Sequence, residues 1–170
     1  MGIYDRQYYR DSEEGFSIES LTRGKSVVFT LIALNVAVFV ADVVAGKNQS
    51  FSNGLASDFL SISGSDLFQP WFWFRFLTYG FAHGSPQHLF WNMFGLYMFG
   101  STVESFMGST KFFWFYVTAV VLGSVCWISG AYLFNQQNFQ NVGLLGASGG
   151  VAGVIIFFCL KFPNQISKHK

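Results

Sequence analysis

Three side chains in apolar parts of the sequence could together carry acyl-transfer chemistry. Ser148 lies in the segment Gly146–Gly150, and His88 and Asn92 are four residues apart, which places them on one face of a helix. Polar residues inside apolar spans are energetically costly and are therefore candidates for function. A serine hydroxyl that faces a histidine and an asparagine combines a nucleophile with hydrogen-bond donors for an oxyanion. This combination would suit cleavage of a peptide bond.

Each of these features also has a simpler explanation. A histidine or an asparagine in an apolar helix can make an ordinary interhelical hydrogen bond. The segment 146–150 matches the G-x-S-x-G nucleophile elbow, but residues 141–145 do not predict the α/β sheet that this elbow requires. Glycines four residues apart let helices pack closely, and the segment holds two such pairs, Gly146 with Gly150 and Gly149 with Gly153. Taken alone, the segment favours helix packing.

The composition is that of a membrane protein. Of the 170 residues, 51% are hydrophobic and only 11% are charged, whereas a soluble domain carries about 25% charged residues. The net charge of +1 gives no broad basic field, which excludes nucleic acid as a partner. Cys126 and Cys159 fall in apolar runs without metal-ligand spacing, so we expect two buried thiols and neither a disulfide framework nor a zinc site. No cluster of residues implies a metal or a cofactor.

Four apolar stretches come close to the roughly 20 residues that a helix needs to cross a bilayer. They are 27–44, 88–103, 112–134 and 142–160. The polar segment 1–25 mixes acidic and basic residues, unlike a signal peptide, and is expected to be a cytoplasmic tail. The sequence is thus predicted to be an all-α polytopic membrane protein with this tail, a transmembrane domain over 26–165 and a polar tail over 166–170.

The distribution of Lys and Arg predicts the orientation of these helices, because cytoplasmic flanks retain positive charge. With the N-terminus inside, eight of the ten basic residues lie in inner segments, and only Lys47 and Arg75 lie in outer ones. The second and fourth spans then both run from outside to inside. Their first turns, which carry His88, Asn92 and Ser148, lie at one depth near the outer face, and glycines let the fourth helix approach the second.

The segment 46–87 between the first two spans is not uniformly polar. Its stretch Trp71–Phe76 is aromatic at every position except Arg75. This density of rings suits the lipid headgroup boundary, so we expect the segment to lie in the membrane interface. A plain aromatic belt that anchors the next helix would explain the same residues.

Several motifs together resemble the rhomboid family of intramembrane serine proteases. The stretches 73–79 (WFRFLTY), 81–83 (FAH) and 88–93 (HLFWNM) are similar to the family's segment that leads into its second core helix. Gly100, Glu104 and Gly108 are similar to the following G-x-x-x-E-x-x-x-G pattern, and residues 146–149 are similar to the G-x-S-G nucleophile motif. The resemblance extends over roughly residues 27–165.

The resemblance implies a fold, an activity and residue roles. The expected fold is a rhomboid-like helical bundle with four of the usual six transmembrane helices. Ser148 would be the catalytic nucleophile. His88 and Asn92 would form the oxyanion hole together with the backbone N–H of Ser148, and Gly146 would allow a close approach before the nucleophile.

The general base of rhomboids is a histidine on the sixth core helix, and this sequence departs from that pattern. His169 lies 21 residues beyond Ser148, which is about 30 Å along a helix and points to the opposite membrane face. His83 precedes the second helix and, like Arg75 and Glu104, matches a structural position of the family. We therefore expect a truncated or frameshifted rhomboid, in which a serine without a base is a weak nucleophile.

Two classes of function remain open. The first is a membrane serine endopeptidase that cleaves transmembrane segments of single-pass membrane proteins. The second is a pseudoprotease that binds transmembrane helices without cutting them. A transporter ranks third, because its ionisable residues should line a midplane path, whereas Asp42 and Glu104 lie near helix ends. The expected location is the plasma membrane of a bacterium, with several passes through the bilayer and the N-terminus in the cytoplasm.

Overall fold

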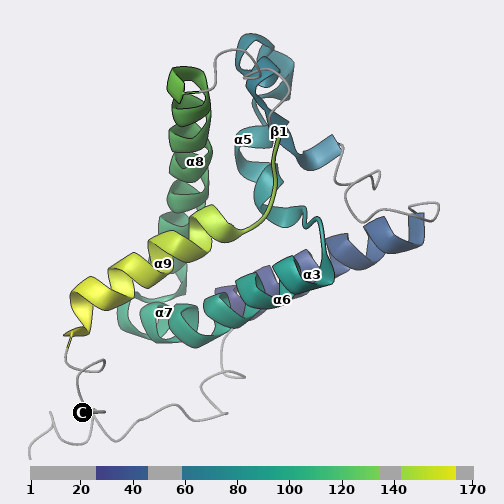
Figure 1. The fold of residues 1–170 in the computed structure, drawn as a ribbon. Coiled ribbons are helices and arrows are strands. Elements are labelled where there is room, and N and C mark those ends of the chain that lie inside the picture. The colour runs from purple at the N-terminus through teal and green to yellow at the C-terminus, as the bar shows by residue number, and fades with distance from the viewer. Residues whose placement is uncertain (1–25, 46–58, 135–142, 164–170) are drawn as a thin grey trace, which may run out of the picture.

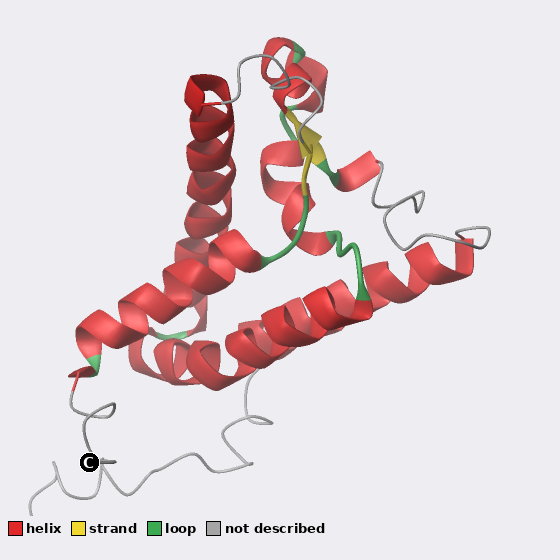
Figure 2. Ribbon diagram, in the orientation of Figure 1, coloured by secondary structure: helices red, strands yellow, loops and turns green. Residues whose placement is uncertain are grey.

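Helices make up most of the structure, a computed structural model that describes residues 26–45, 59–134 and 143–163. The α-helices are α3 (Val27–Ala45), α5 (Arg75–Thr78), α6 (Pro86–Gly95), α7 (Ser101–Met107), α8 (Ser109–Phe134) and α9 (Ser148–Lys161). The other helices are the 3-10 helices η2 (Gly64–Phe68), η3 (Pro70–Phe72) and η4 (Tyr79–Phe81) and the π-helical turn η5 (Leu96–Gly100). Strands β1 (Ile62–Ser63) and β2 (Gly143–Leu144) form an antiparallel pair (Figure 2). The predicted tails over 1–25 and 166–170 lie outside the described residues.

Three long helical units correspond to the first three predicted spans. The helices α3 and α8 are each long and apolar enough to cross a membrane, and α9 is a shorter apolar helix. The helices α6, η5 and α7 follow one another without a break from Pro86 to Met107, and together they rise about 30 Å. The predicted all-helical polytopic architecture is confirmed.

The helices α6 and α9 run in the same direction (Figure 1). A Cβ atom built on Gly95 would lie 3.0 Å from Cγ1 of Val151. Further along the chain in both, the ring of Phe99 in η5, which continues α6, meets the ring of Phe158 in α9 edge to face with centroids 5.1 Å apart. Because residue numbers rise together along both helices, their first turns lie at the same end of the bundle. This is the arrangement that the charge distribution predicts.

The glycines of α9 face α8, which corrects the predicted contact with the second span. A Cβ atom on Gly149 would lie 3.4 Å from Cα of Gly123, and one on Gly153 would lie 2.7 Å from Cβ of Ala119. The two helices are therefore antiparallel and in close contact, as expected where small residues line a helix interface.

The fourth helix begins later than predicted. Gly146 has a φ angle of +113°, which a right-handed helix does not allow, and α9 starts only at Ser148. Gly146 and Gly150 therefore do not form a helical pair. Residues 143–144 form β2 instead of helix, so the predicted span 142–160 was wrong at its beginning.

The prediction that the two cysteines are buried was also wrong. Cys126 on α8 and Cys159 on α9 are free and exposed. An apolar sequence around a cysteine does not place it in the protein core of a membrane protein. One face of a membrane helix contacts neighbouring helices and the other contacts lipid, and both faces are apolar.

Glu104 on α7 determines how α3 and α8 begin at the opposite end of the bundle from Ser148. Its Oε1 accepts hydrogen bonds from the backbone N–H of Val27 at 2.8 Å and from the hydroxyl of Ser109 at 2.6 Å. Its Oε2 accepts bonds from the N–H of Val28 at 3.0 Å and from the hydroxyl of Ser26 at 2.8 Å. A carboxylate is favourable here because the first N–H groups of a helix lack intrahelical partners.

Candidate functional site

Ser148 is the first residue of α9 and follows a turn that two sets of backbone contacts hold in position. Before the turn, Leu144 of β2 pairs with Ile62 of β1. Within the turn, the N–H of Gly146 donates to the carbonyl oxygen of Tyr79 at 2.9 Å. The Ser148 residue is exposed. Its backbone N–H lies in the first helical turn, where N–H groups have no intrahelical acceptor and can bind a developing anion.

Gly146 brings this turn directly against the side chains of α6. A Cβ atom at Gly146 would lie 2.5 Å from Cε1 and 2.6 Å from Nε2 of His88, and 3.5 Å from Nδ2 of Asn92. Such a Cβ atom would overlap the imidazole, so only glycine permits this approach. The Nε2 edge of His88 and the amide of Asn92 therefore lie beside the backbone that leads into Ser148.

The start of α6 fixes the position of His88. The hydroxyl of Ser85 accepts a hydrogen bond from the backbone N–H of His88 at 3.1 Å, and Pro86 occupies the first helical position. Ser at the N-cap and Pro immediately after it are both favoured at helix starts. One turn later, Asn92 lies on the same face and is buried, as the four-residue spacing predicts.

Tyr79 holds the nucleophile turn and α8 together. Its hydroxyl donates to the carbonyl oxygen of Val120 at 2.7 Å, while its own carbonyl oxygen accepts from Gly146. A Cβ atom on Gly149 would lie 2.7 Å from the Tyr79 hydroxyl oxygen. Burial raises the pKa of this hydroxyl to about 12, so it remains a donor at neutral pH.

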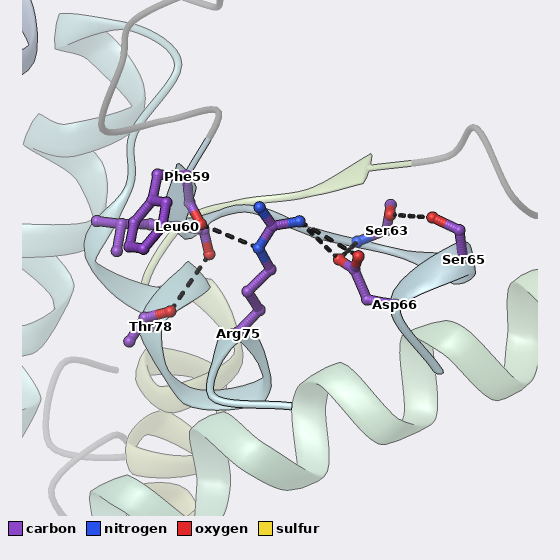
Figure 3. Close-up of polar contacts among 7 residues, drawn as sticks. All are labelled: Phe59, Leu60, Ser63, Ser65, Asp66, Arg75 and Thr78. Carbon is purple, nitrogen blue, oxygen red and sulfur yellow. Dashed lines mark hydrogen bonds and ion pairs between the residues drawn. The ribbon is translucent and has the colours of Figure 1, made fainter. Parts of the chain in front are cut away.

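An ion pair orders the segment that carries β1 (Figure 3). Nη1 of Arg75 lies 3.1 Å from Oδ2 of Asp66, and this carboxylate oxygen also accepts the backbone N–H of Ser63 at 2.9 Å. Nε of Arg75 donates to the carbonyl oxygen of Phe59 at 3.0 Å. Because Ser63 belongs to β1, and β1 pairs with β2 next to the nucleophile turn, Arg75 supports the site from a distance.

His83 also belongs to the site. Its residue is 1% exposed, its Nε2 lies 3.0 Å from Nδ2 of Asn92, and the backbone N–H of Ala147 donates to the same Nε2 at 3.4 Å. The rings of His83 and His88 meet edge to face with centroids 5.1 Å apart. His83 lies in the loop before α6. Burial, and to a lesser extent the neighbouring His88, lower the pKa of His83 to about 4.

The structure thus places the predicted residues His88, Asn92 and Ser148 around one short turn. Within 26–45, 59–134 and 143–163, no hydrogen bond to the Ser148 hydroxyl is formed, and no basic side chain is in place to receive its proton. In the same ranges no group of three or more His, Cys, Asp or Glu residues could hold a metal ion. His169 lies outside the described residues.

Sequence reasoning missed two residues of the site and undervalued a third. Asp66 and Tyr79 carried no spacing signal, because their partners lie in other elements. His83 had a signal, since it precedes His88 and Asn92 in a segment with few other polar side chains. The resemblance placed it at a structural position without naming a partner, and the structure shows it as the hydrogen-bond partner of Asn92.

Comparison with known proteins agrees with this architecture. The sequence model of the family described as "Rhomboid domain" matches residues 70–169. YdcA of Bacillus subtilis (strain 168) is 26% identical over 138 residues, which cover 81% of this chain and 58% of YdcA. "Rhomboid protein 1, mitochondrial" of Saccharomyces cerevisiae is 27% identical over 150 residues, which cover 84% of this chain and 38% of that protein.

A third relative is "Rhomboid-like protein 16, chloroplastic" of Arabidopsis thaliana, which is 27% identical over 151 residues that cover 81% of this chain and 45% of that protein. The chain thus spans about half the length of the curated relatives it matches. The family model covers more than half of the chain, and the helical architecture agrees with it. The chain therefore belongs to the rhomboid family of polytopic, helical integral membrane proteins.

Proposed function

We propose that the chain carries the nucleophile and oxyanion hole of an intramembrane serine endopeptidase. Ser148 is the proposed nucleophile, and His88, Asn92 and the Ser148 N–H are the proposed donors to the oxyanion. One observation carries the proposal, which is the close approach of Gly146 to His88. A Cβ atom built on Gly146 would lie 2.6 Å from Nε2 of His88. The side chains of His88 and Asn92 lie beside the backbone that leads into Ser148, which supports their proposed role as donors.

The proposed reaction proceeds through an acyl-enzyme. The Ser148 oxygen attacks the carbonyl carbon of a peptide bond and its proton passes to a base, while the donors of His88 and Asn92 stabilise the oxyanion of the tetrahedral intermediate. The intermediate collapses, the amine leaves with a proton, and water then hydrolyses the ester at Ser148. In this proposal the described residues supply the nucleophile and the donors, and the proton passes to water or to a base outside the described residues.

The exposed face of α9 provides a binding surface beside the proposed nucleophile. Exposed residues recur along this helix from Ser148 to Lys161, and those between its two ends are Ala152, Ile156, Cys159 and Leu160. They form one apolar stripe that leads to the proposed nucleophile. A transmembrane segment of a single-pass membrane protein would cover this stripe within the bilayer.

The charges at the two ends of the bundle support the proposed orientation. Lys161 lies 5.0 Å from the ring of Phe106 at the end of the bundle where Glu104 binds the start of α3. Arg75 and Ser148 lie toward the opposite end. A cytoplasmic N-terminus, in a bacterial plasma membrane, would place Ser148 near the outer face.

A second candidate function is a pseudoprotease that binds transmembrane helices. It is favoured by the environment of His83, whose Nε2 is already taken by Asn92 and Ala147 and is not directed to Ser148 as a base. The same α9 stripe would then bind a partner helix without cleavage.

A fluorophosphonate probe distinguishes the two candidates. The purified chain in detergent is incubated with the probe, and labelled sites are identified by mass spectrometry. A protease site predicts labelling at Ser148 that is lost in Ser148→Ala and retained in Ser129→Ala, which removes another exposed hydroxyl from α8. Folded chain that remains unlabelled would contradict the protease and leave the binding function.

A further inference from the structure

The proposed reaction assigns no role to His83, although this residue lies within the site. Its imidazole is buried, and it comes from the loop that precedes α6. Its Nε2 is within hydrogen-bonding distance of two groups from different elements, Nδ2 of Asn92 on α6 at 3.0 Å and the backbone nitrogen of Ala147 at 3.4 Å. One ring nitrogen therefore joins the α6 side of the site to the nucleophile turn.

The backbone bond determines which atom carries the proton. A backbone N–H can only donate, so Nε2 of His83 must offer a lone pair to Ala147. The same lone pair then requires Asn92 to present its amide nitrogen and not its carbonyl oxygen. His83 is thereby a neutral ring with its proton on Nδ1.

The bond to His83 leaves one donor of Asn92 available. A side-chain amide has two N–H groups, of which His83 accepts one. The nitrogen that carries the second N–H lies 3.5 Å from a Cβ atom built on Gly146, so it is beside the nucleophile turn. The bond to Ala147 also fixes the Gly146–Ala147 peptide group, which directly precedes the peptide group that carries the Ser148 N–H, the other proposed donor.

We propose that His83 is a positioning residue, whose Nε2 lone pair orients the Asn92 amide and the Ala147 peptide so that their neighbouring donors converge beside Ser148. The inference rests on the proposed function for its catalytic meaning, but the hydrogen bonds themselves can be tested without activity. A role as general base does not fit, because both donors already occupy Nε2, and Nδ1 is buried without a hydrogen-bond partner among the described residues.

Nitrogen-15 NMR of the full chain in detergent micelles tests the hydrogen bonds directly. Histidine-labelled protein, with His83 assigned by its loss in His83→Gln, should show an unprotonated Nε2 and a protonated Nδ1 near neutral pH. The side-chain amide of Asn92 should keep its chemical shift in His83→Gln, whose amide oxygen can accept the bond, and shift in His83→Phe, which has no acceptor. The buried Asn35 amide on α3 is the internal control and should not change in either variant.

The rate of fluorophosphonate labelling at Ser148 tests the catalytic consequence. His83→Phe should slow labelling by about ten- to a hundredfold, because an unoriented donor stabilises an oxyanion poorly, and His83→Gln should recover most of the rate. A protonated Nε2, or an Asn92 amide that does not respond to His83→Phe, would overturn the inference. If the wild-type chain is not labelled, the proposed function fails, while the NMR results still decide whether His83 holds Asn92.

Discussion

Gly146 lies so close to His88 that a Cβ atom does not fit between its backbone and the imidazole. A methyl group in that position would lie 2.5 Å from Cε1 of the ring. The backbone of Gly146 also has a φ angle of +113°, which L-amino acids other than glycine rarely adopt. Two independent physical reasons, steric overlap and backbone strain, therefore require glycine two residues before Ser148.

Gly146→Ala should abolish the arrangement of the site. We expect fluorophosphonate labelling of Ser148 to fall at least about tenfold and the free energy of unfolding to fall by about 1–3 kcal/mol, as overpacking typically does. Unfolding is measured by titration with dodecyl sulfate in mixed micelles. Normal labelling of a folded Gly146→Ala chain would contradict the proposed contact with His88.

Two other glycines separate the causes of this effect. Gly108 has a φ angle of +84° but no atom within 4 Å of a would-be Cβ, so Gly108→Ala reports backbone strain alone. Gly130 lies within α8 with equally open surroundings, so Gly130→Ala reports neither strain nor overlap. Both variants should leave the labelling of Ser148 unchanged.

Arg75→Ala should weaken the site through β1. The change leaves Asp66, whose side chain is 3% exposed, without its cation. Because an unpaired buried charge is unfavourable, we expect a loss of about 3 kcal/mol in unfolding free energy and slower labelling of Ser148. The double variant Arg75→Ala/Asp66→Ala should lose less stability than the sum of the single variants. Lys161→Ala is the control, since this exposed cation lies 5.0 Å from the Phe106 ring and should matter by less than about 1 kcal/mol.

Glu104→Gln should destabilise the bundle without altering its shape. The carboxylate accepts four hydrogen bonds, whereas an amide has one acceptor oxygen and turns two N–H groups toward other donors. We expect a loss of about 2–4 kcal/mol in unfolding free energy. Ser109→Ala removes only one of these bonds and should cost about 1 kcal/mol. An effect of Glu104→Gln no larger than that of Ser109→Ala would show that the network is not cooperative.

The sequence was sufficient to predict the helical architecture. An apolar segment long enough to cross a bilayer must satisfy its backbone hydrogen bonds internally, and a helix does so. The spacing of His88 and Asn92 also predicted their common face, since that relationship lies within one helix. The start of α9 was not predictable from hydropathy. It depends on the φ angle of Gly146, and this angle is set by contacts with His88 and Tyr79 from other parts of the chain.

The same distinction explains which site residues escaped prediction. Asp66 and Tyr79 act through contacts between elements, with Arg75 and Ser63 in one case and with Gly146 and Val120 in the other. Their residue types have no special spacing in the sequence. The outward positions of the cysteines escaped for a related reason, because hydropathy does not distinguish a lipid-facing position from one in the core.

Acidification should destabilise the chain through His83. The pKa of this buried imidazole is lowered from 6.5 to about 4, so the folded protein binds fewer protons than the unfolded chain between these values. The stabilisation by neutral His83 is therefore complete above about pH 6.5 and is lost progressively as the pH falls toward 4. The difference of about 2.5 pKa units corresponds to roughly 3 kcal/mol at the acidic limit. Protonation would also place a donor at Nε2 opposite the N–H groups of Asn92 and Ala147.

The measurement is the unfolding free energy from about pH 7.5 to pH 4, compared with His83→Gln, which cannot titrate. We expect the wild-type curve to fall more steeply than that of the variant across this range. Parallel curves would mean that His83 titrates as freely in the folded protein as in the unfolded chain.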